Sequence, residues 1–152
     1  MTQVTTAAEH VHFLELALAE ARKCVATPTA FCVGAVIVST AGDILATGYS
    51  RELPGNTHAE ANAIDKLPRV NLAGASIYTT MEPCSVRLSG NTPCVDRCLE
   101  SRFANVYIGV EEPADFVACE GNRRLREAGA AVWLVQREGL REECLNEARR
   151  GH

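Results

Sequence analysis

The sequence lacks a long apolar run, is poor in aromatic residues and carries no excess of positive charge. Without about 18 consecutive apolar residues, a membrane-spanning helix is not expected. The 152 residues include 15 lysines and arginines against 19 aspartates and glutamates, a net charge of −4. Nucleic-acid-binding domains are usually strongly basic, and single strands bind on aromatic platforms. We therefore expect neither a membrane partner nor a nucleic-acid partner.

The sequence also shows no internal repeat, no low-complexity tract and no basic stretch followed by an apolar core near residue 1. No secretory signal is therefore expected. Its seven cysteines are an odd number without regular spacing. Such a set fits free thiols and a metal site in a reducing compartment better than a disulfide framework. These absences predict one cytoplasmic domain over residues 1–152.

Short apolar segments alternate between the spacing of strands and that of helices. The first two strands read as an antiparallel pair around the turn at 41–43. Thr6 and Glu9 read as a capping box that opens the first helix, and Pro28 limits its far end. This alternation predicts the α/β class: a three-layer α/β/α sandwich with a mixed five-stranded sheet. The expected strands are 33–38, 44–49, 75–80, 104–110 and 130–135, and the later helices are 58–67, one opening at Pro93, 118–127 and 138–149.

One histidine and two cysteines have the pattern of a catalytic zinc site. His58 and Glu60 form an H-x-E motif, Cys84 follows Pro83, and Cys94 comes ten positions later. Two thiolates and an imidazole bind Zn²⁺ and leave a fourth position open for water. Cys98, one helical turn after Cys94, is an alternative ligand, but Cys94 is favoured because it stands at the expected helix start. A structural zinc would need a fourth protein ligand, and no His or Cys lies next to this set.

Glu60 suits proton transfer because it follows His58 by two residues without being needed as a ligand. Zinc lowers the pKa of a coordinated water toward about 7. A carboxylate beside that water can accept its proton, pass it to a ring nitrogen and later protonate the departing amine. The signature of zinc-dependent nucleobase deaminases is H-x-E followed by P-C-x-x-C. This chain keeps the first half and stretches the second, with nine residues instead of two between Cys84 and Cys94. The sequence therefore predicts a zinc-dependent aminohydrolase with Glu60 as the catalytic acid/base.

Two longer motifs, 48–60 (GYSRELPGNTHAE) and 78–94 (YTTMEPCSVRLSGNTPC), extend this pattern. With them the chain resembles the cytidine-deaminase-like superfamily, and within it the deaminases of fungal riboflavin biosynthesis. The resemblance implies hydrolysis of 2,5-diamino-6-(5-phosphoribitylamino)pyrimidin-4(3H)-one to the corresponding uracil with release of ammonia. It also implies Zn²⁺ as cofactor, a phosphorylated pyrimidine as partner and a homodimer. The long spacing between the cysteines is shared with bacterial riboflavin deaminases, whereas cytidine and tRNA adenosine deaminases generally keep a short C-x-x-C.

The resemblance also suggests where the substrate binds. The loop between the cysteines lies at the mouth of such a site, and the segment before His58 forms the opposite wall. Arg51 and Arg87 can equally be solvent-exposed loop charges. Alternative functions are a deaminase of cytosine, cytidine or guanine, a tRNA adenosine deaminase, and a scaffold that uses zinc only for stability. The candidate substrate-binding residues are Arg51, Asn56, Ala59, Arg87, Ser89 and Asn91.

Overall fold

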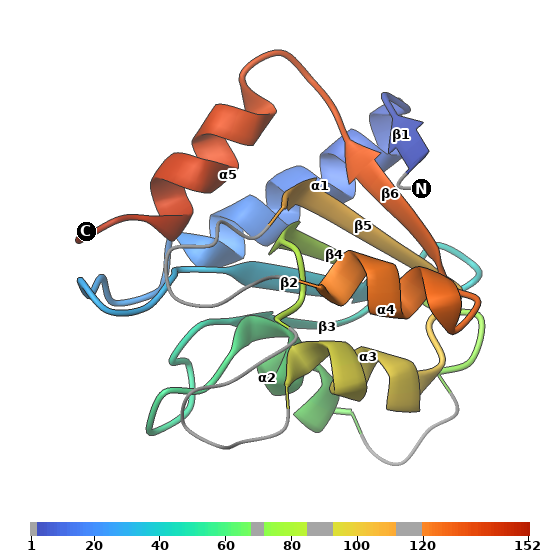
Figure 1. Cartoon of the computed structure of the whole chain (residues 1–152), viewed down its shortest axis with the longest axis horizontal. Helices are drawn as coiled ribbons and strands as arrows, with labels where there is room; N and C mark the ends of the chain where they lie inside the picture. Colours follow the sequence, from blue (N-terminus) through green and yellow to red (C-terminus); the bar gives the residue numbers. More distant parts are fainter. Residues whose placement is uncertain (1–2, 68–71, 85–92, 112–119) are drawn as a thin grey trace.

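Six strands form one mixed sheet in the computed structural model, which describes residues 3–67, 72–84, 93–111 and 120–152 (Figure 1). The strand order is β1-β6-β5-β4-β2-β3. β1, β6, β5 and β4 run parallel, whereas β2 pairs antiparallel with both β4 and β3. The mixed sheet and the antiparallel pair around 41–43 are therefore confirmed. The strands are β1 Gln3–Thr5, β2 Gly34–Val38, β3 Ile44–Tyr49, β4 Ser76–Met81, β5 Asn105–Val110 and β6 Ala131–Val135.

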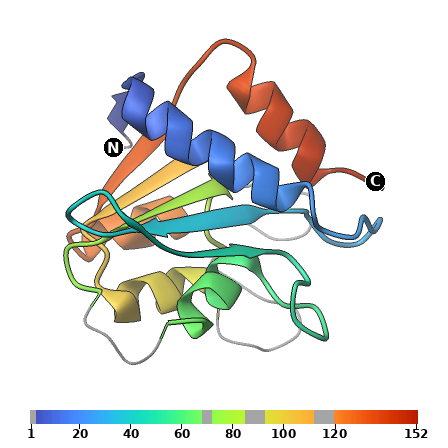
Figure 2. The ribbon, with the colours of Figure 1, turned by 180° about the vertical axis from the view of Figure 1, so that it is seen from behind.

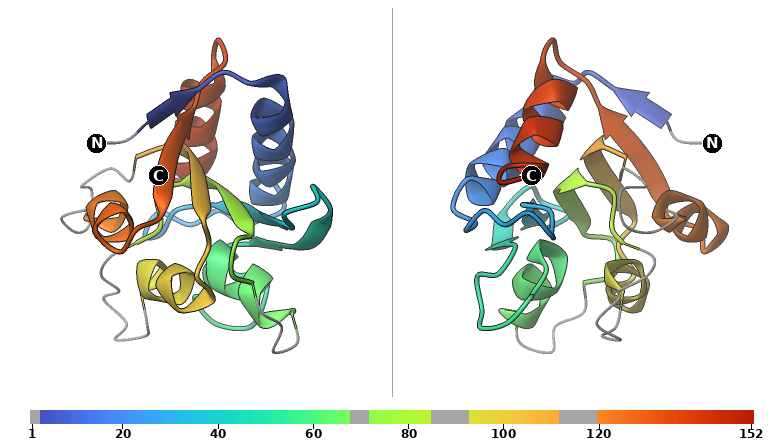
Figure 3. Two further views of the ribbon diagram at one scale, coloured as in Figure 1. Left: turned by 90° about the vertical axis from the view of Figure 1, so that its right-hand side faces the viewer. Right: turned by 60° about the vertical axis from the view of Figure 1, so that its left-hand side comes forward.

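Helices cover both faces of the sheet, as the three-layer prediction requires. α1 and α5 lie together over one face (Figure 2). α2, α3 and α4 cover the other face, and an edge-on view separates the three layers (Figure 3). The helices are α1 Ala8–Ala21, α2 Ala59–Asp65, α3 Cys94–Ser101, α4 Gly121–Glu127 and α5 Leu140–Ala148.

Alternate residues of the central strands supply the two hydrophobic cores. Ile77 on β4 pairs in register with Val106 on β5, which pairs with Val132 on β6, and all three face α2, α3 and α4. The next row, which includes Tyr78 and Tyr107, faces α1 and α5. Successive side chains of a strand point to opposite faces, so each central strand is buried on both sides.

The sixth strand and the start of α1 differ from the sequence-based expectation. β1 has only three residues, and its strand character comes from pairing with the edge of β6, continued where the Gln136 N–H donates to the Thr5 carbonyl at 2.9 Å. A segment so short and half polar carries no strand periodicity of its own. The predicted capping box of Thr6 and Glu9 was wrong, because the N-cap of α1 is Ala7 and has no side-chain cap. The Ala7 N–H instead donates to Thr5 Oγ1. Within the described ranges, no helix is long and apolar enough to cross a membrane.

Gly48 on β3 lets α2 pack directly against the sheet. A Cβ at this position would lie 2.4 Å from the Ala59 carbonyl oxygen and 2.7 Å from the Ala63 nitrogen. Both atoms belong to α2 backbone, which cannot move aside as a flexible side chain can. Close approach of the strand and the helix therefore depends on glycine at this position.

Replacing Gly48 by alanine should lower the free energy of unfolding by about 1–3 kcal/mol, because overpacking forces backbone shifts. It should also lower turnover, since α2 carries the H-A-E motif. Urea unfolding and a rate assay check both effects. Leu45→Ala, on the same strand with 41% of the residue exposed, is the control and should change stability far less. Wild-type stability in Gly48→Ala would contradict the packing.

Candidate active site

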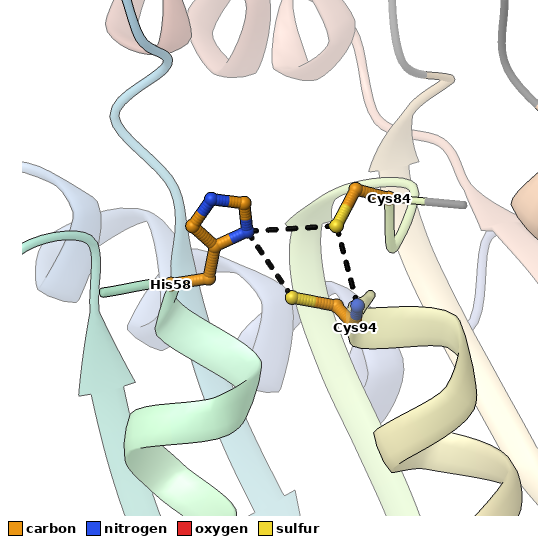
Figure 4. A group of neighbouring side chains, drawn as sticks. All are labelled: His58, Cys84 and Cys94. Carbon is orange, nitrogen blue, oxygen red and sulfur yellow. Dashed lines mark hydrogen bonds between the residues drawn. The ribbon is translucent and has the colours of Figure 1, made fainter. Parts of the chain in front are cut away.

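Three segments distant in sequence bring His58, Cys84 and Cys94 together. His58 is the N-cap of α2, Cys94 is the first residue of α3, and Cys84 follows the end of β4. The imidazole and the two sulfurs face one another (Figure 4). One ligand atom from each residue lies within 4.8 Å of the others, and Cys84 and Cys94 are buried.

The spacing of these atoms fits a zinc ion. His58 Nδ1 lies 3.2 Å from Cys94 Sγ and 3.5 Å from Cys84 Sγ. With Zn–N near 2.0 Å and Zn–S near 2.3 Å, tetrahedral ligands would stand about 3.5 Å apart. One nitrogen and two sulfur donors also suit zinc, and three protein ligands leave one position open, as in catalytic sites. These three residues therefore fit a zinc ion, with Nδ1 as the donor atom of His58.

N–H groups in the first turn of α3 hold Cys84 in place through hydrogen bonds. The Cys94 backbone N–H donates to Cys84 Sγ at 3.2 Å, and the Val95 N–H donates to the Cys84 carbonyl at 3.0 Å. Hydrogen bonds from the Cys94 thiol and from His58 lower the pKa of Cys84 to about 4, although burial opposes them. The same thiol–thiol bond and burial raise the pKa of Cys94 well above its usual value. Zinc binds thiolates, so both cysteines must give up their protons when the metal binds.

Glu60 lies in the first turn of α2 with 4% of the residue exposed. Burial raises the pKa of its carboxyl, and the nearby Cys84 thiolate raises it further, against the opposing effects of His58, Cys94 and Thr79. The Thr79 hydroxyl lies 3.1 Å from Glu60 Oε1 and 2.9 Å from the Met81 carbonyl oxygen, so two acceptors share its single proton. A buried carboxylate held beside a ligand cluster in this way is arranged to exchange a proton.

The candidate substrate-binding residues lie in different surroundings. The Arg51 guanidinium donates to the Val25 and Phe31 carbonyls and to Cys24 Sγ, so it ties its loop to the segment before β2. Asn56 is exposed, whereas Ala59 is fully buried within the core. Substrate contact by these three stays a prediction, and for Arg51 the contacts favour a structural role. Arg87, Ser89 and Asn91 lie outside the described residues.

Two polar residues near the site were missed from the sequence. Thr79 is a fully buried hydroxyl on β4, and Glu82 is a carboxylate with 7% of the residue exposed. The available signal was a run of hydroxyl-bearing residues and a glutamate in or directly after an expected central strand, because polar groups buried there need partners. Glu82 finds its partner at Asn122, 40 positions later, which no local pattern indicates.

Comparison with known proteins agrees with this geometry. Residues 7–110 match the family described as the cytidine and deoxycytidylate deaminase zinc-binding region. The chain belongs to this family. The matched range contains the His58, Cys84 and Cys94 cluster, so the zinc-dependent deaminase class and the cytidine-deaminase-like fold predicted from the sequence are confirmed.

Several known proteins are similar to this chain over most of its length. The diaminohydroxyphosphoribosylamino-pyrimidine deaminase of Schizosaccharomyces pombe is 49% identical over 147 residues, which are 94% of the chain and 36% of that protein. The crystal structure of Aspergillus oryzae Rib2 deaminase, a C-terminal deletion mutant, is 37% identical with a TM-score of 0.82, covering 95% of this chain and 93% of that one. The same Aspergillus protein in complex with DARIPP gives 35% identity and a TM-score of 0.79 over 95% and 92%. The chain spans about a third of the length of the curated relatives it matches.

Proposed function

We propose that this chain deaminates the phosphorylated pyrimidine intermediate of riboflavin synthesis. The substrate would be 2,5-diamino-6-(5-phosphoribitylamino)pyrimidin-4(3H)-one, and the products 5-amino-6-(5-phosphoribitylamino)uracil and ammonia. The similarity to Aspergillus Rib2 deaminase over nearly the full length of both chains carries this proposal. That protein was crystallised with DARIPP, and the S. pombe relative is a deaminase of the same pathway chemistry by name.

Different residues of the site would bind the metal and transfer protons. His58, Cys84 and Cys94 would hold zinc, which when bound lowers the pKa of a coordinated water toward about 7. Glu60 would accept one proton of the attacking water at a carboxylate oxygen and deliver it to the pyrimidine ring nitrogen. It would then take the second proton of that water, from the hydroxyl now on C2, and pass it to the 2-amino group, which leaves as ammonia when the C–N bond breaks. Its raised pKa favours holding the proton between these transfers. The Thr79 hydroxyl, which also lies 2.9 Å from the Met81 carbonyl, would keep the carboxyl group oriented through its contact with Oε1.

Substrate selection is the part of the proposal that an assay tests most directly. Ammonia release should be fastest with the ribitylamino pyrimidine phosphate, slower with its ribosylamino counterpart and absent with cytidine. The reason is that a pocket built for a phosphorylated, polyhydroxylated side chain leaves its polar groups unpaired when that chain is missing. The three compounds should be compared side by side by kcat/KM, with the zinc content of the enzyme measured in parallel.

The outcomes separate the alternatives. Faster turnover of the ribosylamino compound would mean that the enzyme acts before the sugar chain is reduced from the ribosyl to the ribityl form. Turnover of cytidine alone would identify a nucleoside deaminase and contradict the proposed substrate. A zinc-loaded protein that releases ammonia from none of the three would contradict the proposal as a whole.

A further inference from the structure

We propose that Glu82 is a positioning residue that holds Cys84 in place for metal by binding the start of α4. The inference rests on the proposed zinc ligand set and goes beyond it, because Glu82 itself is not a ligand. It assigns a function to α4, whose first residues lie against the segment that carries Cys84.

The contacts of Glu82 join three elements at the end of β4. Its Oε2 accepts the backbone N–H of Asn122 at 2.8 Å, in the first turn of α4. Its own N–H donates to the Val110 carbonyl at 2.9 Å, at the end of β5. The residue is 7% exposed, so this carboxylate is removed from water and depends on its protein partners. Glu82 is thus fixed on one side by the sheet and on the other by a helix.

Gly121 shows how closely α4 meets this segment. A Cβ there would lie 2.1 Å from the Pro83 carbonyl oxygen and 3.3 Å from Glu82 Cγ. The start of α4 therefore lies directly on the Glu82–Pro83 peptide, and only glycine permits this approach. Pro83 has no N–H with which to anchor itself. The segment is joined to α4 by the Asn122 N–H, which donates to Glu82 Oε2.

Cys84 is consequently held between two helices. Towards α3, its carbonyl and sulfur accept N–H groups from the first turn of that helix. Towards α4, it is connected through Pro83 to the Glu82 bond. A zinc ligand needs its sulfur fixed within a few tenths of an ångström, and groups behind the ligands commonly change metal affinity or activity 10- to 100-fold. Loss of the Glu82 carboxylate should remove the connection to α4 and leave this segment with the Glu82 N–H bond to Val110 and the contacts of Cys84 with α3.

The experiment compares metal retention in wild type, Glu82→Ala and Glu82→Gln. Zinc release to an excess of chelator should be about tenfold faster in Glu82→Ala. The visible and near-ultraviolet spectrum of its cobalt(II)-substituted form should shift, because the cysteine-to-cobalt bands report on sulfur placement. Glu82→Gln retains an oxygen acceptor and should lie closer to wild type. Neither measurement depends on the identity of the substrate.

Arg123→Ala is the matched control. Arg123 is exposed on α4 and pairs only with helix neighbours, Glu120 and Glu127, among the ion pairs that the described part of the chain shows for it. Its removal weakens α4 without touching the Glu82 bond, so zinc release should stay at the wild-type rate. Zinc release accelerated as much in Arg123→Ala as in Glu82→Ala would show a general loss of helix stability and overturn the proposal.

A folded Glu82→Ala protein with wild-type zinc release and an unchanged cobalt spectrum would also overturn it. If that variant does not fold, Gly121→Ala takes its place, because an added Cβ must push α4 away from Pro83. Faster zinc release in Gly121→Ala supports the proposal and an unchanged rate contradicts it. Cys84→Ser serves as the reference: wild-type zinc binding in that variant would refute the ligand set, a failure distinct from that of Glu82.

Discussion

Glu60→Gln should lower the rate of ammonia release by about 10²–10⁴-fold while zinc content stays at the wild-type level. The amide has nearly the same shape as the carboxylate and can keep the contact with the Thr79 hydroxyl seen at Oε1. It cannot accept and return a proton at neutral pH. Since Glu60 is 4% exposed and its pKa is raised chiefly by burial, the substitution also removes a buried charge without leaving a cavity. Metal analysis and a steady-state ammonia assay measure the two quantities on one sample.

Glu100→Gln is the control for this change. Glu100 is exposed on α3, so the same chemical substitution outside the site should leave turnover unaltered. Retained turnover in Glu60→Gln would remove Glu60 from the proton-transfer role. Loss of zinc in that variant would instead indicate that the carboxylate contributes to metal binding, which the H-x-E spacing argues against.

The metal cluster could be predicted from the sequence because each of its members stands at a boundary that local patterns mark. His58 ends a polar loop before a helix, and Pro93 precedes the helix that begins at Cys94. A helix start provides free N–H groups, and in the structure one of them, that of Cys94, binds the Cys84 sulfur. The choice of Cys94 over Cys98 followed from the same rule, and the structure places Cys94 beside His58.

Other features depend on tertiary contacts and are not indicated by any local pattern in the sequence. β1 exists because β6 offers an unpaired edge, so the six-stranded sheet was predicted with five strands. The Glu82 bond to Asn122 joins residues that are close only after β5 and α4 have packed beside β4. Arg51 was placed near the substrate by its position in the chain, but its guanidinium turns toward residues 24–32. The direction of this side chain was set by partners remote in sequence, which chain position does not reveal.

Cys94→Ala should abolish both zinc binding and ammonia release, whereas Cys98→Ala should retain both. The two cysteines lie one turn apart on α3 and are almost equally buried, at 0% and 1% exposure. They differ in their surroundings: Cys94 Sγ lies 3.2 Å from His58 Nδ1, while Cys98 packs in the core beside Val95. Removing Cys94 leaves two ligands, too few for the three-ligand catalytic site that should hold about one zinc per chain. Removing the Cys98 sulfur costs packing alone.

Thermal unfolding distinguishes these roles without any substrate. Metal that binds only the folded state raises its stability, so a chelator should lower the Tm of wild type and of Cys98→Ala. The Tm of Cys94→Ala should not respond to the chelator, because no zinc remains to be removed. Cys98→Ala should start from a somewhat lower Tm owing to its smaller core side chain. A chelator response in Cys94→Ala but not in Cys98→Ala would reverse the assignment and make Cys98 the ligand. α3 would then have to be shifted by one turn along its axis.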